Sequence, residues 1–136
     1  MNSDTARVAQ SFIAAINRHS VGDISELMSE NHTFIDSQGH TVVGREAMIT
    51  GWTAYFGMFP DFEIIIEQIL TDGNIVAIFG RAAGTFNGKR GVLPQNRIAM
   101  PCAWKAVIAD DKVKLWEVYA DWTEGMKIVE RESGPG

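Results

Sequence analysis

Cysteine is nearly absent from this chain of 136 residues, which holds only Cys102. One cysteine excludes an internal disulfide and a cysteine-based zinc cluster, so nothing in the sequence demands an oxidising compartment. Cys102 itself could be a nucleophile, but no basic partner is identifiable. The sequence therefore favours a buried structural thiol at this position.

Excess positive charge and long apolar runs are also missing. The 12 lysines and arginines are outnumbered by 17 acidic residues, and the net charge is -5. The basic residues form no stripe, so no nucleic acid is expected as a partner. No apolar run reaches the length of a membrane span, and the N-terminus lacks the basic-then-apolar pattern of a signal peptide. We therefore expect no membrane contact and a cytoplasmic location.

Metal and cofactor motifs are missing as well. The three histidines are scattered, so they place no set of three ligands on one element. No glycine-rich phosphate loop, nucleophile elbow or dinucleotide fingerprint occurs. We expect neither a metal nor a cofactor.

What the chain does contain is the composition of a soluble globular protein, with 46% hydrophobic and 21% charged residues. Its length suits one compact domain over residues 1–136 and is too short for two. The tail, residues 132–136, ends in Gly-Pro-Gly, and we expect it to be frayed and disordered.

The first half of the chain reads mainly as helix. Apolar spacing predicts a helix from Ser3 to His19 and a short second helix starting at 23–26. Alternation over residues 31–36 predicts a short strand. The spacing of the apolar residues then changes from that of a strand to that of a helix. Residues 41–59 are therefore expected to form a helix that has one aromatic face and ends at Pro60.

The second half reads as strand. Runs of β-branched and aromatic residues are separated by turn residues, and they predict strands at 62–70, 74–86, 97–109 and 112–122. Residues 87–96 are rich in turn residues and are expected to form a loop. Helices followed by antiparallel strands predict the α+β class, with the helices on one face of a curved sheet. Such a sheet leaves a hollow in which small molecules bind.

Several patterns, taken in order, resemble the nuclear-transport-factor-2-like superfamily, and within it the SnoaL-like and ketosteroid-isomerase-like group. They are "AINRHSVGDISELMSENHTFID", "VVGREAM", "GTFNGKRGVLPQNRIAMP" and "KLWEVYAD". The resemblance covers roughly Thr5 to Met126. It implies a cone-like, strongly curved mixed sheet, closed by helices packed across its concave face, with a deep pocket inside. It also implies a homodimer formed through the outer sheet face. The fold alone does not imply one reaction.

The same resemblance implies a role for Asp36, which falls where the ketosteroid isomerases keep their general base. Those enzymes polarise the substrate carbonyl with a tyrosine from the first helix and a protonated acid from a later strand. The matching positions, near Ala15 and Ala103, carry methyl groups here. Steroid isomerisation is therefore not expected.

Two other enzyme groups of this fold offer different analogies. In the limonene-epoxide-hydrolase-like enzymes an Asp-Arg-Asp arrangement activates water; Arg81 and Asp121 resemble two of its members, but the remaining acid would lie near Ala83. The SnoaL-like polyketide cyclases depend mainly on one acid-base aspartate. Either Asp121 or Asp36 satisfies that requirement.

Asp121 stands out because aspartate is depleted in strands and this one ends the last predicted strand. If the face that holds Tyr119 and Asp121 is concave, the two side chains enter the hollow about 7 Å apart, beside Trp104. Partial desolvation would then raise the pKa of Asp121 toward the range of a general base. The alternative, that Asp121 caps the strand end or pairs with an arginine, stays open. Asp36 has a similar alternative, because "DSQG" is ordinary turn chemistry.

Aromatic residues supply candidates for the ligand-binding wall. We expect Trp52, Phe56, Trp104 and Phe34 to line the hollow, together with Tyr119 and Arg81. The same aromatic set also offers Tyr55, Phe59 and Phe79 as candidates. At helical spacing, such aromatic residues are also ordinary core.

Two functions follow from these expectations. One is a cofactor-independent acid-base isomerase or cyclase that acts on a small apolar carbonyl compound. The other is a non-catalytic module that binds a small ligand or a protein partner. In either case we expect a homodimer that buries the outer face bearing Trp116, Val118 and Trp122. Whether the loop 87–96 closes over the pocket stays open.

Overall fold

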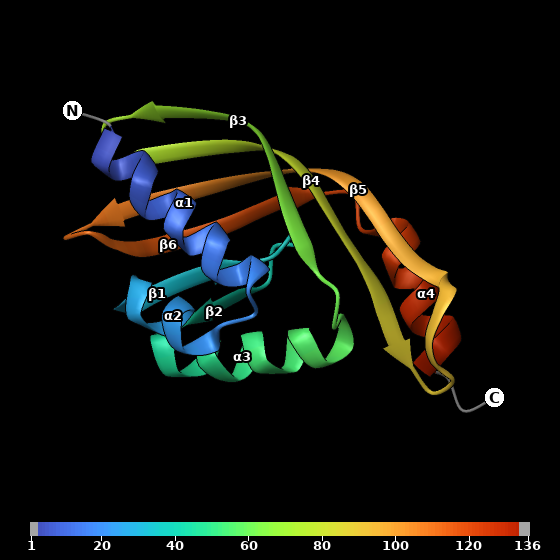
Figure 1. Ribbon diagram of the computed structural model, residues 1–136. Helices are drawn as coiled ribbons and strands as arrows, with labels where there is room; N and C mark the ends of the chain where they lie inside the picture. Colours follow the sequence, from blue (N-terminus) through green and yellow to red (C-terminus); the bar gives the residue numbers. More distant parts are fainter. Residues whose placement is uncertain (1–2, 134–136) are drawn as a thin grey trace.

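Four helices and one six-stranded sheet build the fold in this computed structural model, which describes residues 3–133 (Figure 1). The elements in chain order are α1 (Ser3–Asn17), α2 (Val21–Leu27), β1 (Met28–Ile35), β2 (Thr41–Val43), α3 (Arg45–Met58), β3 (Glu63–Asp72), β4 (Ile75–Gly88), β5 (Gly91–Ala109), β6 (Lys112–Ala120) and α4 (Thr123–Ser133). None of the helices within residues 3–133 combines the length and the apolar character needed to cross a membrane.

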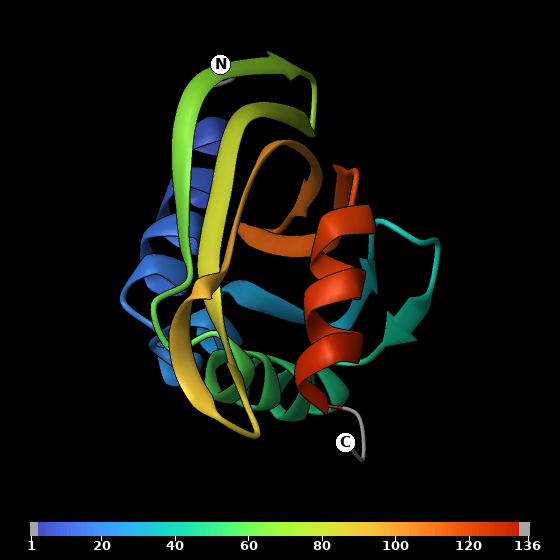
Figure 2. The same ribbon diagram turned by 90° about the vertical axis from the view of Figure 1, so that its right-hand side faces the viewer.

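The sheet is mixed, with strand order β2-β1-β6-β5-β4-β3. Neighbouring strands are antiparallel except β1 and β6, which run parallel. The long strands β4 and β5 bend strongly along their length, and the sheet curls without closing (Figures 1 and 2). The predicted fold class is confirmed: this is an α+β domain whose curved sheet is covered by helices on its concave side.

The core lies where α1 and α2 cover one end of the concave face. Four residues of α1 recur at helical spacing and are at most 2% exposed: Ala9, Phe12, Ile13 and Ile16. The ring of Phe12 packs 4.9 Å from that of Trp116 on β6, and Trp104 of β5 stacks beside Trp116 at 6.4 Å. Burial of these large apolar side chains is the main force that holds helices to sheet.

Three predicted segments differ from the structure. Residues 41–43 form strand β2 before the helix begins at Arg45. The predicted loop 87–96 is the tip of a hairpin, in which Gly88 pairs with Gly91 across a two-residue turn. Gly91 has φ +87, a conformation that glycine adopts without strain. This segment is therefore strand, and the expected mouth loop does not exist in that form.

The C-terminal helix α4 is the largest difference. The sequence interpretation continued the last strand to Trp122 and took residues 132–136 as a disordered tail. Residues 132 and 133 belong instead to α4, and the side chain of Glu132 is buried; residues 134–136 lie outside the described part. α1 and α4 lie at opposite ends of the curved sheet (Figures 1 and 2).

Glu132 fastens α4 to the β4–β5 hairpin. Its carboxylate accepts hydrogen bonds from both Nε and Nη2 of Arg90 and from Nε of Arg131. The backbone carbonyl of Glu132 also accepts from the Lys89 amide at 3.0 Å. The hydrogen bonds from Arg90 and then Arg131 lower the pKa of Glu132 from 4.5 to about 2.

The outer, convex face of the sheet does not carry the residues that the sequence analysis placed there. Trp116 is 1% exposed and in the core, and Val118 and Trp122 face inward as well, so the predicted dimer surface was wrong. Phe79 and Tyr119 are 42% and 52% exposed, and both pair with Ala103 across adjacent strands. The homodimer stays a prediction, and this apolar row would be its contact surface.

Replacing Glu132 by glutamine should lower the melting temperature at neutral pH, because Arg90 and Arg131 lose a charged partner. The folded state lowers the pKa of Glu132, so this carboxylate stabilises the fold above about pH 4.5 and loses that contribution as the pH falls toward 2. The difference in melting temperature between wild type and Glu132→Gln should therefore shrink over that range. Glu124→Gln, an exposed change in the same helix, is the control. A pH-independent difference would contradict this assignment.

Candidate functional site

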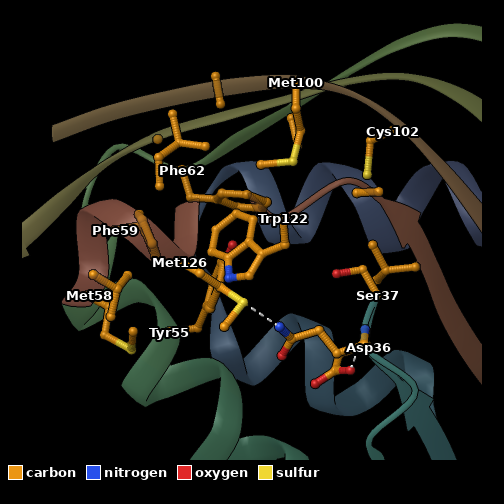
Figure 3. Close-up of a pocket in the computed structure, with 18 of the residues that line it drawn as sticks. Asp36, Ser37, Tyr55, Met58, Phe59, Phe62, Met100, Cys102, Trp122 and Met126 are labelled. Carbon is orange, nitrogen blue, oxygen red and sulfur yellow. Dashed lines mark hydrogen bonds between the residues drawn. The ribbon is translucent and has the colours of Figure 1, made fainter. Parts of the chain in front are cut away.

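A cavity of about 380 Å³ lies between the concave face of the sheet, helices α3 and α4, and the turn after β1 (Figure 3). Its lining comes from every one of these parts: Phe34, Asp36, Ser37, Gln38, Tyr55, Met58, Phe59, Phe62, Ala82, Ala83, Gly84, Ile98, Met100, Cys102, Trp104, Val118, Ala120, Trp122, Met126, Val129 and Glu130. Most of these side chains are apolar, so water finds few hydrogen-bond partners inside the cavity. An apolar ligand that enters is stabilised because its apolar surface is removed from water.

Aromatic rings form one continuous wall of the cavity. Tyr55 lies 5.1 Å from Phe59 and 4.9 Å from Phe62, measured between ring centroids. Phe59 in turn meets Trp122 edge-on at 5.9 Å. Each ring limits the rotation of the next, so the wall has a fixed shape.

Trp122 owes its position to the start of α4. A Cβ added at Gly125 would lie 2.9 Å from the Trp122 ring, so the indole packs directly on the backbone of this helix. Glycine is required here by close approach and not by backbone conformation. Trp122, Met126 and Val129 follow at helical spacing and bring α4 into the cavity wall.

Asp36 lies at the edge of this cavity and also organises the turn after β1. Its Oδ1 accepts from the backbone amides of Gln38 and His40, both at 2.9 Å, and its Oδ2 lies 3.1 Å from Nδ1 of His40. Partial desolvation raises the pKa of Asp36, but the hydrogen bonds from His40 and Gln38 outweigh it and hold the pKa below its usual value. The sequence left two interpretations of Asp36 open, a turn residue and a pocket residue. In the structure Asp36 is both.

The same turn reaches across to α4. Nε2 of Gln38 donates to the sulfur of Met126 at 2.7 Å, and this contact is drawn in Figure 3. Two acids, Asp36 and Glu130, contribute to the lining, whereas no lysine, arginine or histidine among the described residues does. The local charge is therefore negative.

Asp121 does not enter the cavity, and the prediction that it lies there beside Tyr119 was wrong. Asp121 is exposed, and its Oδ1 accepts from the amide of Thr123 at 3.0 Å and from the Thr123 hydroxyl at 2.6 Å. These hydrogen bonds, from the hydroxyl and then the amide, lower its pKa. The alternative of a cap is the one the structure shows: Asp121 organises the turn that begins α4.

The predicted aromatic residues divide between cavity and core. Phe34 and Trp104 line the cavity, but Trp52 and Phe56 do not. Trp52 is 6% exposed and stacks on Phe56 at 5.5 Å, and Phe56 stacks on His19 at 4.1 Å, so both belong to the packing behind the wall.

Arg81 and Tyr119, also predicted to bind ligand, lie elsewhere. Both side chains are exposed and neither lines the cavity. They alternate with inward-facing neighbours on β4 and β6, and the sequence interpretation assigned the wrong face of each strand. Ala15, which matches the tyrosine position of the isomerases, is fully buried and also outside the lining.

The lining residues that sequence reasoning missed are chiefly Phe62, Met100, Trp122 and Met126, whereas Tyr55 and Phe59 were candidates from the aromatic set that were not favoured. One signal was available: Trp122, Met126 and Val129 have helical spacing after the last strand. Within residues 3–133, no group of three histidine, cysteine or acidic side chains is placed to hold a metal ion.

These features define a class of protein, a curved-sheet α+β domain with an apolar cavity between sheet and helices. The sequence profile of the SnoaL-like domain matches residues 9–116, and the chain belongs to this family. No curated protein matches the sequence.

Solved structures agree on the fold. A candidate SnoaL-like polyketide cyclase from Jannaschia sp. CCS1 has 20% sequence identity and a TM-score of 0.80, with 98% of this chain and 94% of that chain covered. A candidate polyketide cyclase from Xanthomonas campestris pv. campestris has 14% identity and a TM-score of 0.84, covering 94% and 98%. An M. tuberculosis LEH-like epoxide hydrolase has 17% identity and a TM-score of 0.77, covering 96% and 92%. At these identities the likeness shows the fold alone.

The position of Asp121 leads to a test of its role. Asp121→Ala removes the acceptor for both Thr123 groups and should lower the melting temperature by about 2–6 °C without changing ligand affinity. Asp121→Asn keeps a carbonyl oxygen there and should stay near wild type in thermal melts. If the asparagine variant instead abolished turnover of a substrate at unchanged stability, the structural assignment would be wrong.

Proposed function

We propose that the protein binds a small, uncharged and largely apolar carbonyl compound in this cavity. The observation that carries the proposal is the lining itself, an aromatic and aliphatic wall around about 380 Å³. That volume lies within the range of pockets that enclose ligands of drug size, about 300–1,000 Å³. The family offers no single ligand, because one fold hosts many functions.

The charge of the lining narrows the ligand class. Asp36 and Glu130 are the ionisable acids of the lining, and no basic side chain of the described residues faces the cavity to pair with an anion. A carboxylate ligand would lose its hydration and meet like charge. A neutral ketone or quinone avoids both costs.

A second candidate function, acid-base catalysis on the bound carbonyl compound, is favoured by the position of Asp36. Asp36 lines the cavity and its lowered pKa keeps the carboxylate ionised at neutral pH, so the group is always available to take a proton from the carbon next to the carbonyl but is a weaker base than an unshifted aspartate. The reaction would be an enolisation, the first step of an isomerisation or cyclisation, and it requires no cofactor. Several structural neighbours are described as polyketide cyclases.

Filling the cavity should weaken binding. Ala82 lines the cavity and is 6% exposed, so Ala82→Leu places three extra carbon atoms inside. We expect affinity for 1-tetralone, a bicyclic ketone, to fall at least about tenfold by calorimetry, which corresponds to about 1.4 kcal/mol. Ala99→Leu on β5, where the side chain is exposed, is the matched control and should bind normally. Equal affinity in wild type and Ala82→Leu would contradict the proposal. So would tighter binding of 1-naphthoate, a bicyclic carboxylate, than of 1-tetralone.

Asp36→Asn tests the catalytic candidate. Asparagine can still accept from the turn amides but cannot take a proton. Wild type in D₂O should speed the exchange of the hydrogens at C2 of 1-tetralone, and the variant should lose about 10²-fold to 10⁴-fold of that rate at nearly unchanged affinity. Asp61→Asn is the control, since Asp61 likewise accepts a backbone hydrogen bond, and also one from the Thr85 hydroxyl, but does not line the cavity. If wild type binds 1-tetralone but does not accelerate the exchange of its C2 hydrogens, the catalytic candidate is wrong and only the binding function remains.

A further inference from the structure

Tyr55 is held in one orientation by its neighbours on α3 and on the segment that follows. Its ring meets Trp52 edge-on at 6.1 Å and Phe62 edge-on at 4.9 Å, and it lies 5.1 Å from Phe59. Aromatic contacts on three sides fix both side-chain torsions. The direction of the hydroxyl is therefore set before any ligand arrives.

That hydroxyl faces the cavity. Tyr55 is part of the lining, and its side chain points from α3 toward the interior (Figure 3). Tyr55 is half-buried, and among residues 3–133 no hydrogen bond to its hydroxyl is present, so the O–H group opens on the cavity. A ligand that fills the cavity takes this hydroxyl away from water, so a ligand with an acceptor at that point replaces the lost hydrogen bond and a hydrocarbon does not.

The protonation state of Tyr55 fixes its role. Burial, and to a lesser extent the nearby Cys102, raise the pKa of Tyr55 far above its usual value. Burial also raises the pKa of Cys102 to about 11, so the thiol stays protonated and is a weak donor. At any physiological pH Tyr55 therefore offers a neutral O–H group, which suits an uncharged acceptor.

From this geometry we infer that the Tyr55 hydroxyl donates a hydrogen bond to the carbonyl oxygen of the ligand and selects carbonyl compounds over hydrocarbons of the same shape. The inference rests on the proposed function, since it names the group that recognises the proposed ligand class. It makes Tyr55 a specificity-determining residue. Ligands enter with the carbonyl oxygen directed at α3 and the hydrocarbon body against the aromatic wall.

A pair of probes of equal shape tests the inference. 1-Tetralone and tetralin share the bicyclic skeleton and differ in the carbonyl group. In wild type the ketone should bind tighter than the hydrocarbon. Tyr55→Phe keeps the ring and should reduce that preference by about two- to twelvefold, the range expected for one hydrogen bond, while tetralin affinity stays level or rises. Tyr119→Phe, which alters the chain's other tyrosine on the outer face, should change neither affinity.

Infrared spectroscopy adds a measurement that loosened packing alone would not alter. A hydrogen bond to the carbonyl lowers its stretching frequency, so 1-tetralone bound to wild type should absorb below its value in hexane. Bound to Tyr55→Phe, it should return toward the hexane value. Equal loss of affinity for both probes, or an unchanged carbonyl frequency in the variant, would overturn the inference while the proposed function stands. If neither probe binds wild type, the proposed function fails and the inference fails with it.

Discussion

Strand β5 has 19 residues, which at about 3.4 Å per residue would span about 65 Å if it were straight. Helix α1 has 15 residues and spans about 22 Å. One helix cannot cover such a strand, so the sheet has to bend and other elements have to close the remainder of its concave face. α1 and α2 fill one end with core, around Phe12 and Trp116. At the other end α3 and α4 approach the sheet from two sides, and the space between them is the cavity.

One wall of the cavity is formed by α4, so the cavity depends on the position of this helix. Carboxylate side chains fix α4 near both of its ends. Asp121 organises the turn at its start, and Glu132 accepts from Arg90 and Arg131 near its end. Between these fixed ends lie Trp122 and Met126, which line the cavity. An aspartate that stands out in the last strand thus has a structural cause. Asp121 positions the start of α4 without lining the cavity itself.

The sequence predicted the elements better than the faces they expose. Helix α1 and strands β3 and β4 were predictable because their apolar residues repeat with a clear period. The inward face of β6 was not, because its two faces carry Trp116 and Val118 on one side and Leu115 and Tyr119 on the other, and both mix apolar with polar character. Packing of Phe12 on Trp116, which pairs residues from the two halves of the chain, settles the choice. No local pattern contains that contact.

Helix α4 was missed for a related reason. Gly125 in its first turn lowers helix propensity, and a run of charged residues follows it. The glycine is explained by Trp122, whose ring lies where a Cβ would project, and the buried acid Glu132 is explained by two arginines. Tertiary contacts therefore override local preference at both positions. For the candidate site, this meant that Phe34, Trp104 and Asp36 were found from the sequence and Tyr55 was a candidate that was not favoured, whereas the α4 side of the wall was not found.

Two groups of the cavity have pKa values displaced in opposite directions. Turn hydrogen bonds keep Asp36 ionised, and burial keeps Tyr55 neutral. Both shifts reinforce the ordinary state of each group, so at neutral pH Asp36 is an acceptor of hydrogen bonds and Tyr55 is a donor. For a carbonyl compound these are complementary demands, because an enolate forms when a base removes the α-proton while a donor stabilises the oxygen. Asp36 comes from a turn and Tyr55 from a helix, so the fold sets the two groups independently. Either can be altered while the other keeps its environment, which allows binding and proton transfer to be measured apart.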